Sequence, residues 1–162
     1  MFYLNSTRPE NTMLTAAAHQ FQHMLFFTSK AGMNRTADDA WIDEGLAHMA
    51  SQLAGYIDFE KEGWSDEQAN GWVYDEEYGY LYNTNQVNVL FQDGSLALQG
   101  GASLFTSYLT EQYGSDLVDE VLNSSNDPVQ VIDNYAEQSF VHIYANWITA
   151  TLADNVEEVD SE

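Results

Sequence analysis

Two histidines, His19 and His23, stand four positions apart in a stretch whose apolar residues follow helical spacing. On a helix, residues four apart lie on one face, about one turn from each other. At this spacing two imidazoles can bind one zinc ion, although such pairs also occur on helices that bind no metal. The apolar flanks predict a buried helix, and buried imidazoles require polar partners or a metal.

A third ligand is available in Glu44, which follows in the next predicted helix after a short connection. A short turn can fold that helix back against the first one. Two histidines and one glutamate leave a fourth position for water, which is the arrangement of catalytic zinc sites. The sequence therefore predicts a zinc ion bound by His19, His23 and Glu44.

The elements that position these residues are predicted to be mainly helical. Thr36 is placed to cap the second helix, with Asp38 and Asp39 in its first turn, where carboxylates interact favourably with the helix dipole. Residues 56–100 are the least regular part, and both two short strands and a long aromatic loop are compatible with them. Helices are expected at about 11–29, 36–54, 102–112, 116–122, 129–135 and 139–152.

The chain length of 162 residues suits one domain, expected over residues 1–153, with an acidic, flexible tail over 154–162. The 44% of hydrophobic residues can form a core. No apolar run is long enough for membrane insertion, and no signal-peptide pattern opens the chain. The lack of cysteine excludes disulfides and thiolate metal ligands.

The acidic residues number 26 against four basic ones, which gives a formal net charge of −22. Such a surface disfavours nucleic acid and anionic lipid as partners. Two interpretations stay open, namely adaptation to a saline setting, where salt screens repulsion, and attraction of cationic substrates or calcium. The acidic cluster 75–77 lacks the alternating ligand spacing of a calcium loop, which favours a solvated face.

Two segments resemble the hyicolysin-like metallopeptidases, a family of the gluzincin type. Segment 18–24, AHQFQHM, is similar to the active-site helix of that family, which typically reads AHEFQHM. Segment 41–47, WIDEGLA, is similar to its glutamate helix, which is close to WLNEGLS, and segments 101–114 and 140–152 resemble later helices.

The resemblance implies a zincin-like, gluzincin catalytic domain of the mainly α (α+β) class, represented mostly by its helical part with little sheet. It further implies zinc-dependent endopeptidase cleavage of a peptide or protein substrate, and a secreted or extracellular location. In the family, a sheet-bearing stretch precedes the active-site helix, and its edge strand binds substrate. Here only about residues 2–4 could contribute such a strand, so the chain is expected to be either a fragment or a reduced form whose sheet comes partly from residues 72–92.

Gln20 occupies the position at which the family carries its general base, a glutamate. An amide cannot accept a proton from water at neutral pH, and loss of a general base costs about 10²–10⁴ in rate. Zinc binding is expected to persist, because Gln20 is not a ligand. An engineered inactive variant and a natural pseudoenzyme both fit this sequence, and Asp43 is an alternative base.

His48 stands four residues after Glu44, where gluzincins often place an acidic residue that orients the first zinc histidine. We expect Asp43 and His48 to surround the ligands. For His48, a hydrogen bond to a ligand, replacement of Glu44 as a ligand, and simple packing are the alternatives.

Many zinc peptidases support the oxyanion of the reaction with a side-chain donor. Tyr78, Tyr80 and Tyr82 are candidates for this role, and so is His142 in the last predicted helix, although packing is the more ordinary role for each. The leading function is therefore a zinc metallopeptidase domain impaired by Gln20. The alternatives are a non-catalytic, zinc-containing peptide-binding module and a structural helical domain with an incidental histidine pair.

Overall fold

The computed structural model describes residues 10–31, 40–55, 71–77, 79–90 and 95–153. These ranges contain eight helices and no strand. The helices are α1 (Glu10–Lys30), α2 (Ala40–Leu53), α3 (Gly71–Tyr74), α4 (Tyr80–Asn83), α5 (Leu96–Tyr113), α6 (Ser115–Asn123), α7 (Pro128–Ala136) and α8 (Phe140–Ala153). The expectation of a mainly helical chain is confirmed for the described residues.

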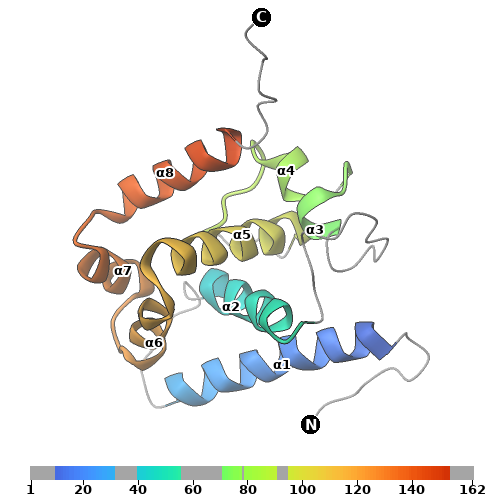
Figure 1. Cartoon of the computed structure of the whole chain (residues 1–162). Helices are drawn as coiled ribbons and strands as arrows, with labels where there is room; N and C mark the ends of the chain where they lie inside the picture. Colours follow the sequence, from blue (N-terminus) through green and yellow to red (C-terminus); the bar gives the residue numbers. More distant parts are fainter. Residues whose placement is uncertain (1–9, 32–39, 56–70, 78, 91–94, 154–162) are drawn as a thin grey trace, which may run out of the picture.

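The long helices are stacked in the order α1, α2, α5 and α8 (Figure 1). Helix α2 lies between α1 and α5 and contacts both. The short helices α3 and α4 pack against α5, and α6 joins α5, α1 and α7 at the other side of the stack (Figure 1). The two candidate metal-binding helices, α1 and α2, are therefore neighbours on one side of α5.

The core is built from aromatic and aliphatic side chains of α2, α4, α5, α6, α7 and α8, with Phe26 from α1. Phe105 of α5 is fully buried, and its ring contacts Phe140, Tyr144 and Trp147 of α8 at centroid distances of 5.6, 5.3 and 4.9 Å. Such edge-to-face and tilted ring contacts stabilise a core beyond the burial of area alone. Large rings thus connect α8 to α5, whereas small residues bring α2 close to α5.

The close approach of α2 to α5 occurs at Gly45. A Cβ atom at this position would lie 2.0 Å from Oγ1 of Thr106 and 2.7 Å from the carbonyl oxygen of Ala102. No side chain fits into that space, so glycine permits the contact. Because Gly45 follows Glu44 directly, this contact also fixes the backbone that carries the candidate metal ligand.

Helix α5 begins at Leu96, six residues before the expected start at residue 102. The Ser95 side chain caps it by accepting a hydrogen bond from the backbone N–H of Leu98. The sequence places two glycines inside this helix, and their role is packing, because a Cβ at Gly100 would lie 2.0 Å from the carbonyl oxygen of Trp72. The absence of a side chain at Gly100 therefore allows α3 to pack closely against α5.

The strands considered for residues 72–92 are wrong for the described part of that segment. Residues 71–77 and 79–90 contain α3 and α4 together with turns. Val73, Tyr80 and Val89 are buried there, so packing against α5 organises the segment without a sheet. Residues 2–4 and the tail 154–162 lie outside the described residues.

Helix α1 is anchored at its C-terminal end by Lys30, which is 6% exposed. Its Nζ donates hydrogen bonds to the carbonyl oxygens of Val121 and, at 2.9 Å, of Ser124, at the end of α6. A cation at the C-terminal end of a helix interacts favourably with the helix dipole. No described helix is both long enough and apolar enough to cross a membrane.

Candidate metal centre

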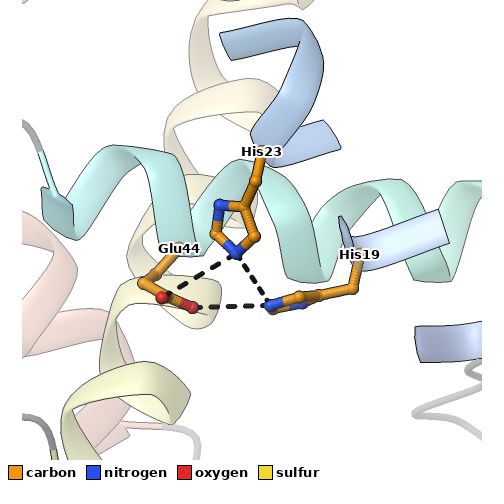
Figure 2. Close-up of side chains that lie close together, drawn as sticks. All are labelled: His19, His23 and Glu44. Carbon is orange, nitrogen blue, oxygen red and sulfur yellow. Dashed lines mark hydrogen bonds and ion pairs between the residues drawn. The ribbon is translucent and has the colours of Figure 1, made fainter. Parts of the chain in front are cut away.

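The helices α1 and α2 pack side by side, which brings His19 and His23 of α1 to Glu44 of α2. One turn further along, the Ser51 hydroxyl of α2 donates a hydrogen bond of 2.9 Å to the carbonyl oxygen of Thr15 in α1. In Figure 2 the two imidazoles and the carboxylate point toward one common place, and dashed lines join them in a triangle. The three predicted ligands are thus brought together.

The sides of this triangle match the dimensions of a zinc site. Nε2 of His19 and Nε2 of His23 are 3.0 Å apart. Oε2 of Glu44 lies 3.6 Å from the His19 nitrogen, and Oε1 lies 3.8 Å from the His23 nitrogen. Ligand atoms about 2.0–2.1 Å from a tetrahedral zinc ion are about 3.3 Å apart. The observed distances bracket that value, so the three residues fit a zinc ion.

A buried oxygen of Glu44 supports this assignment. Oε2 is inaccessible to solvent and has no hydrogen-bond donor among the described residues. Burial raises the pKa of Glu44, with an opposing contribution from His23. An unpaired carboxylate oxygen is costly to bury, and a bound cation removes that cost.

The two histidines differ in their electrostatic surroundings. Burial, and secondarily the nearby His23, lowers the pKa of His19 to about 4, so that ring is neutral at neutral pH. A hydrogen bond with Asp43 raises the pKa of His23, and burial opposes this shift. Binding of a metal to His23 must therefore release more bound proton, on average, than binding to His19.

Asp43 is brought to the site as expected. Its Oδ1 lies 3.0 Å from Nδ1 of His23, on the opposite side of the ring from the nitrogen that faces Glu44. The side chain is 27% exposed, so the pair lies at the edge of the site.

His48 is also brought next to the ligands. It is 2% exposed, and its ring centroid lies 4.7 Å from that of His19. Nε2 of His48 is buried without a hydrogen-bond partner among the described residues. Burial, with smaller effects of His19 and His23, lowers the pKa of His48 to about 2, so the ring is neutral. It does not belong to the group of ligand atoms that converge on one point.

Trp72 completes the surroundings, and the sequence analysis did not single it out for this role. Its ring lies 4.1 Å from that of His48 and 6.3 Å from that of His19, measured between centroids. Trp72 belongs to α3, far from both histidines in the sequence, and only the contact of its backbone with Gly100 places it here. No local pattern could have indicated this position.

Gln20 is exposed and follows His19 on α1. Its amide can donate and accept hydrogen bonds, but it cannot take up a proton near neutral pH.

The described candidates for oxyanion support lie on α4 and α8. Tyr80 is buried in the core and stacks on Trp147, with ring centroids 5.7 Å apart. Burial raises the pKa of Tyr80, so its phenol stays neutral. Tyr82 is exposed on α4, and His142 is exposed on α8, where its Nδ1 lies 3.2 Å from Oγ of Ser139. The core position of Tyr80 argues against this role for it, the role stays a prediction for Tyr82 and His142, and Tyr78 lies outside the described residues.

A separate open groove of about 480 Å³ is lined by residues of α3, α4, α5 and α8, among them Tyr74, Tyr108 and Glu111. None of the metal-centre residues lines it. The exposed aromatic Tyr74 thus contributes to a different surface of the molecule.

No protein-family model, curated protein or solved structure matches this chain.

Proposed function

We propose that this chain is a zinc-binding domain of the gluzincin metallopeptidase type, in which Gln20 stands where the general base is required. The observation that supports this proposal is the convergence of His19, His23 and Glu44, whose ligand atoms all lie within 4.8 Å of one another. The similarity of segments 18–24 and 41–47 to the active-site helices of hyicolysin-like enzymes agrees with it. The substrate class is peptide or protein.

A zinc ion in this place supplies polarisation of a peptide carbonyl and activation of water. The chain supplies two imidazoles and one carboxylate, a set that leaves a position open for catalysis. Gln20 lies next to His19 and can orient a water by hydrogen bonding, but it cannot deprotonate it. The domain is therefore a metallopeptidase scaffold whose activity is strongly reduced.

Metal analysis tests the first half of this proposal. The protein is purified without a histidine tag, dialysed against zinc and then against buffer, and analysed by mass spectrometry for metal. We expect one zinc per chain in the wild type and loss of zinc in His19→Ala and in Glu44→Ala. His142→Ala is the matched control, because this exposed histidine of α8 does not belong to the group of converging ligand atoms. Less than about half a zinc per wild-type chain would contradict a specific zinc site.

Restoration of the base tests the second half. We expect Gln20→Glu to raise the rate of casein cleavage by about 10²–10⁴, since that is the usual contribution of a general base. The activity must disappear with a chelator. Gln22→Glu introduces the same charge two residues away and is expected to leave the rate unchanged.

A zinc-loaded Gln20→Glu variant that cuts no peptide would favour the alternative function, a zinc-containing peptide-binding module without catalysis. Gln20 itself is the observation that keeps this alternative open, because binding of a peptide needs no general base.

A further inference from the structure

The groove between α5 and α8 is a second concave surface, and none of the candidate metal ligands lines it. Its volume of about 480 Å³ lies within the usual range of sites that bind small ligands. On α5 the lining residues recur every three or four positions between Leu104 and Gln112, so they share one face of the helix. Figure 1 shows α8 beside α5, and α3 and α4 near one end of α5. These four helices together form the groove.

Aromatic side chains form much of this surface. Trp147 of α8 is 2% exposed, and its ring lies 5.7, 4.9 and 5.3 Å from the rings of Tyr80, Phe105 and Tyr144, measured between centroids. The core therefore fixes the position of this lining residue. Tyr74 of α3 also lines the groove, and 48% of it is exposed. The groove thus presents aromatic surface to a ligand before any ligand is bound.

Glu111 is the one charged residue among the described residues that line the groove. It is exposed and forms no hydrogen bond or ion pair with another described side chain. Tyr108 lies one turn before it on the same face of α5. The acidic cluster 75–77 directly follows Tyr74 in the sequence. Carboxylates attract cations, and so do the electron-rich faces of aromatic rings, so both features favour a cationic ligand.

We propose that this groove binds an arginine side chain of a peptide or protein partner. The groove is open, so a side chain can enter while its backbone stays outside. The planar guanidinium group can stack on a tyrosine ring while its N–H groups donate to the carboxylate of Glu111. The aliphatic stem can cover Leu81 and Leu104, which also line the groove. Lysine carries a more strongly hydrated charge and has no plane that stacks, so it should bind more weakly.

The test measures binding of the peptide acetyl-Gly-Arg-Gly-amide to the full chain by NMR, in the presence of a chelator. We expect the backbone amide signals of Ser107 and Gln112 and the indole signal of Trp147 to move as the peptide is added. Two matched peptides carry lysine or citrulline in place of arginine. Citrulline has the shape of arginine without its charge, so its peptide should bind at least about fivefold more weakly.

A double variant and a matched double control locate the site. Glu111→Gln removes an exposed ion pair and Tyr74→Ala removes an exposed cation–π contact, and each should weaken binding by about two- to fivefold. Together they should weaken binding by about 4–25-fold, if the two contributions are independent. The control combines Glu120→Gln on α6 with Tyr135→Ala on α7, which are both exposed and do not line the groove. It removes the same charge and the same ring, and should bind like the wild type.

The inference is overturned if the arginine peptide moves no groove signal at concentrations up to about 10 mM, or if the two double variants bind it within about twofold of each other. Citrulline binding as tight as arginine binding would show that the groove recognises an uncharged ligand. Equally tight lysine binding would show attraction of charge without stacking. Either result refutes an arginine site.

This inference does not rest on the proposed function, because the groove contains no candidate metal ligand. His23→Ala should therefore bind the arginine peptide as tightly as the wild type. A chain that binds no zinc but binds the arginine peptide would refute the metal centre and support the groove. A chain that binds zinc but not the peptide would refute the groove alone.

Discussion

The imidazole of His48 meets the indole of Trp72 edge to face, with ring centroids 4.1 Å apart and ring planes at 78°. Trp72 belongs to α3, whose backbone lies against Gly100 of α5. On its other side the His48 ring lies against His19. A chain of contacts thus leads from α5 through α3 and His48 to the ring of His19, a candidate metal ligand.

The first prediction concerns the buried ring of His48. Its Nε2 has no partner among the described residues, so an apolar side chain of similar size should be tolerated. We expect His48→Leu to change the free energy of unfolding by less than about 1.5 kcal/mol. His48→Ala should lower it by about 2–5 kcal/mol, because a cavity remains beside Trp72 and His19. Urea unfolding measures both values. The His48→Leu protein should still bind zinc. Loss of zinc binding in this variant would indicate that His48 is itself a ligand.

The second prediction concerns the dependence of stability on pH in the metal-free protein. Burial lowers the pKa of His19 to about 4 and that of His48 to about 2, whereas the unfolded chain protonates both near pH 6.5. Below that pH the unfolded state binds more protons, so stability falls as the pH drops. His23 acts in the opposite direction, because its pKa is raised and its contribution is lost as the pH rises.

Below pH 6.5 His23 is protonated in both the folded and the unfolded chain, so it adds almost no slope. The two lowered groups therefore give a fall of at most about 2.7 kcal/mol per pH unit between pH 6.5 and about 5, which the raised pKa of Glu44 partly offsets. Urea unfolding with a chelator at several pH values measures this slope. In His48→Leu only one lowered group, His19, remains, so the slope should fall to about half. A wild type that becomes more stable over this range on acidification would contradict the assignment.

The third prediction concerns removal of the metal. A ligand that binds only the folded state at 100 times its Kd stabilises by about 2.7 kcal/mol. For a chain of this size, that raises the Tm by about 5–11 °C. The shift should occur with zinc in the wild type and in His142→Ala, and be absent in His23→Ala. Calorimetry with and without a chelator measures it. An equal shift in His23→Ala would mean that zinc binds elsewhere on the acidic surface.

The fourth prediction concerns the contact of α2 with α5. A methyl group at Gly45 collides with Oγ1 of Thr106 at 2.0 Å and with the carbonyl oxygen of Ala102 at 2.7 Å. We expect Gly45→Ala to destabilise by about 1–3 kcal/mol through overpacking and to weaken zinc binding by displacing Glu44. Thr106→Ala should restore only part of the stability, because the backbone oxygen stays in place. Chemical unfolding and zinc competition measure the two effects, and a Gly45→Ala protein with unaltered stability would refute the close packing.

The helices next to strong local signals could be predicted from the sequence. For α1 and α6–α8 the expected ends fall within about two residues of the observed ones, because apolar spacing, Pro128 and the Asp127 cap act locally. The convergence of His19, His23 and Glu44 was predictable for the same reason, since the two histidines share one helix face and Glu44 lies on the next helix.

The parts that depend on distant contacts were not predictable. The two glycines of α5 signal flexibility in the sequence, but in the structure they admit Trp72 and Tyr80 to the surface of the helix. Tyr80 had the residue type for catalysis, and only its stacking on Trp147 shows that it packs in the core. The reach of Asp43 to His23 depends on the rotation of α2 against α1, which Gly45 sets through α5.

The three candidate metal ligands belong to helices that are buried to different extents. Glu44 sits beside Gly45 in the most tightly packed helix pair, whereas the histidines belong to an outer helix in which, of the side chains described, only Phe26 and Lys30 are buried. An ion held between them works as a cross-link that fastens this outer helix to the interior. Chelation would then loosen α1 first while the remaining helices stay assembled, and both imidazoles would leave together.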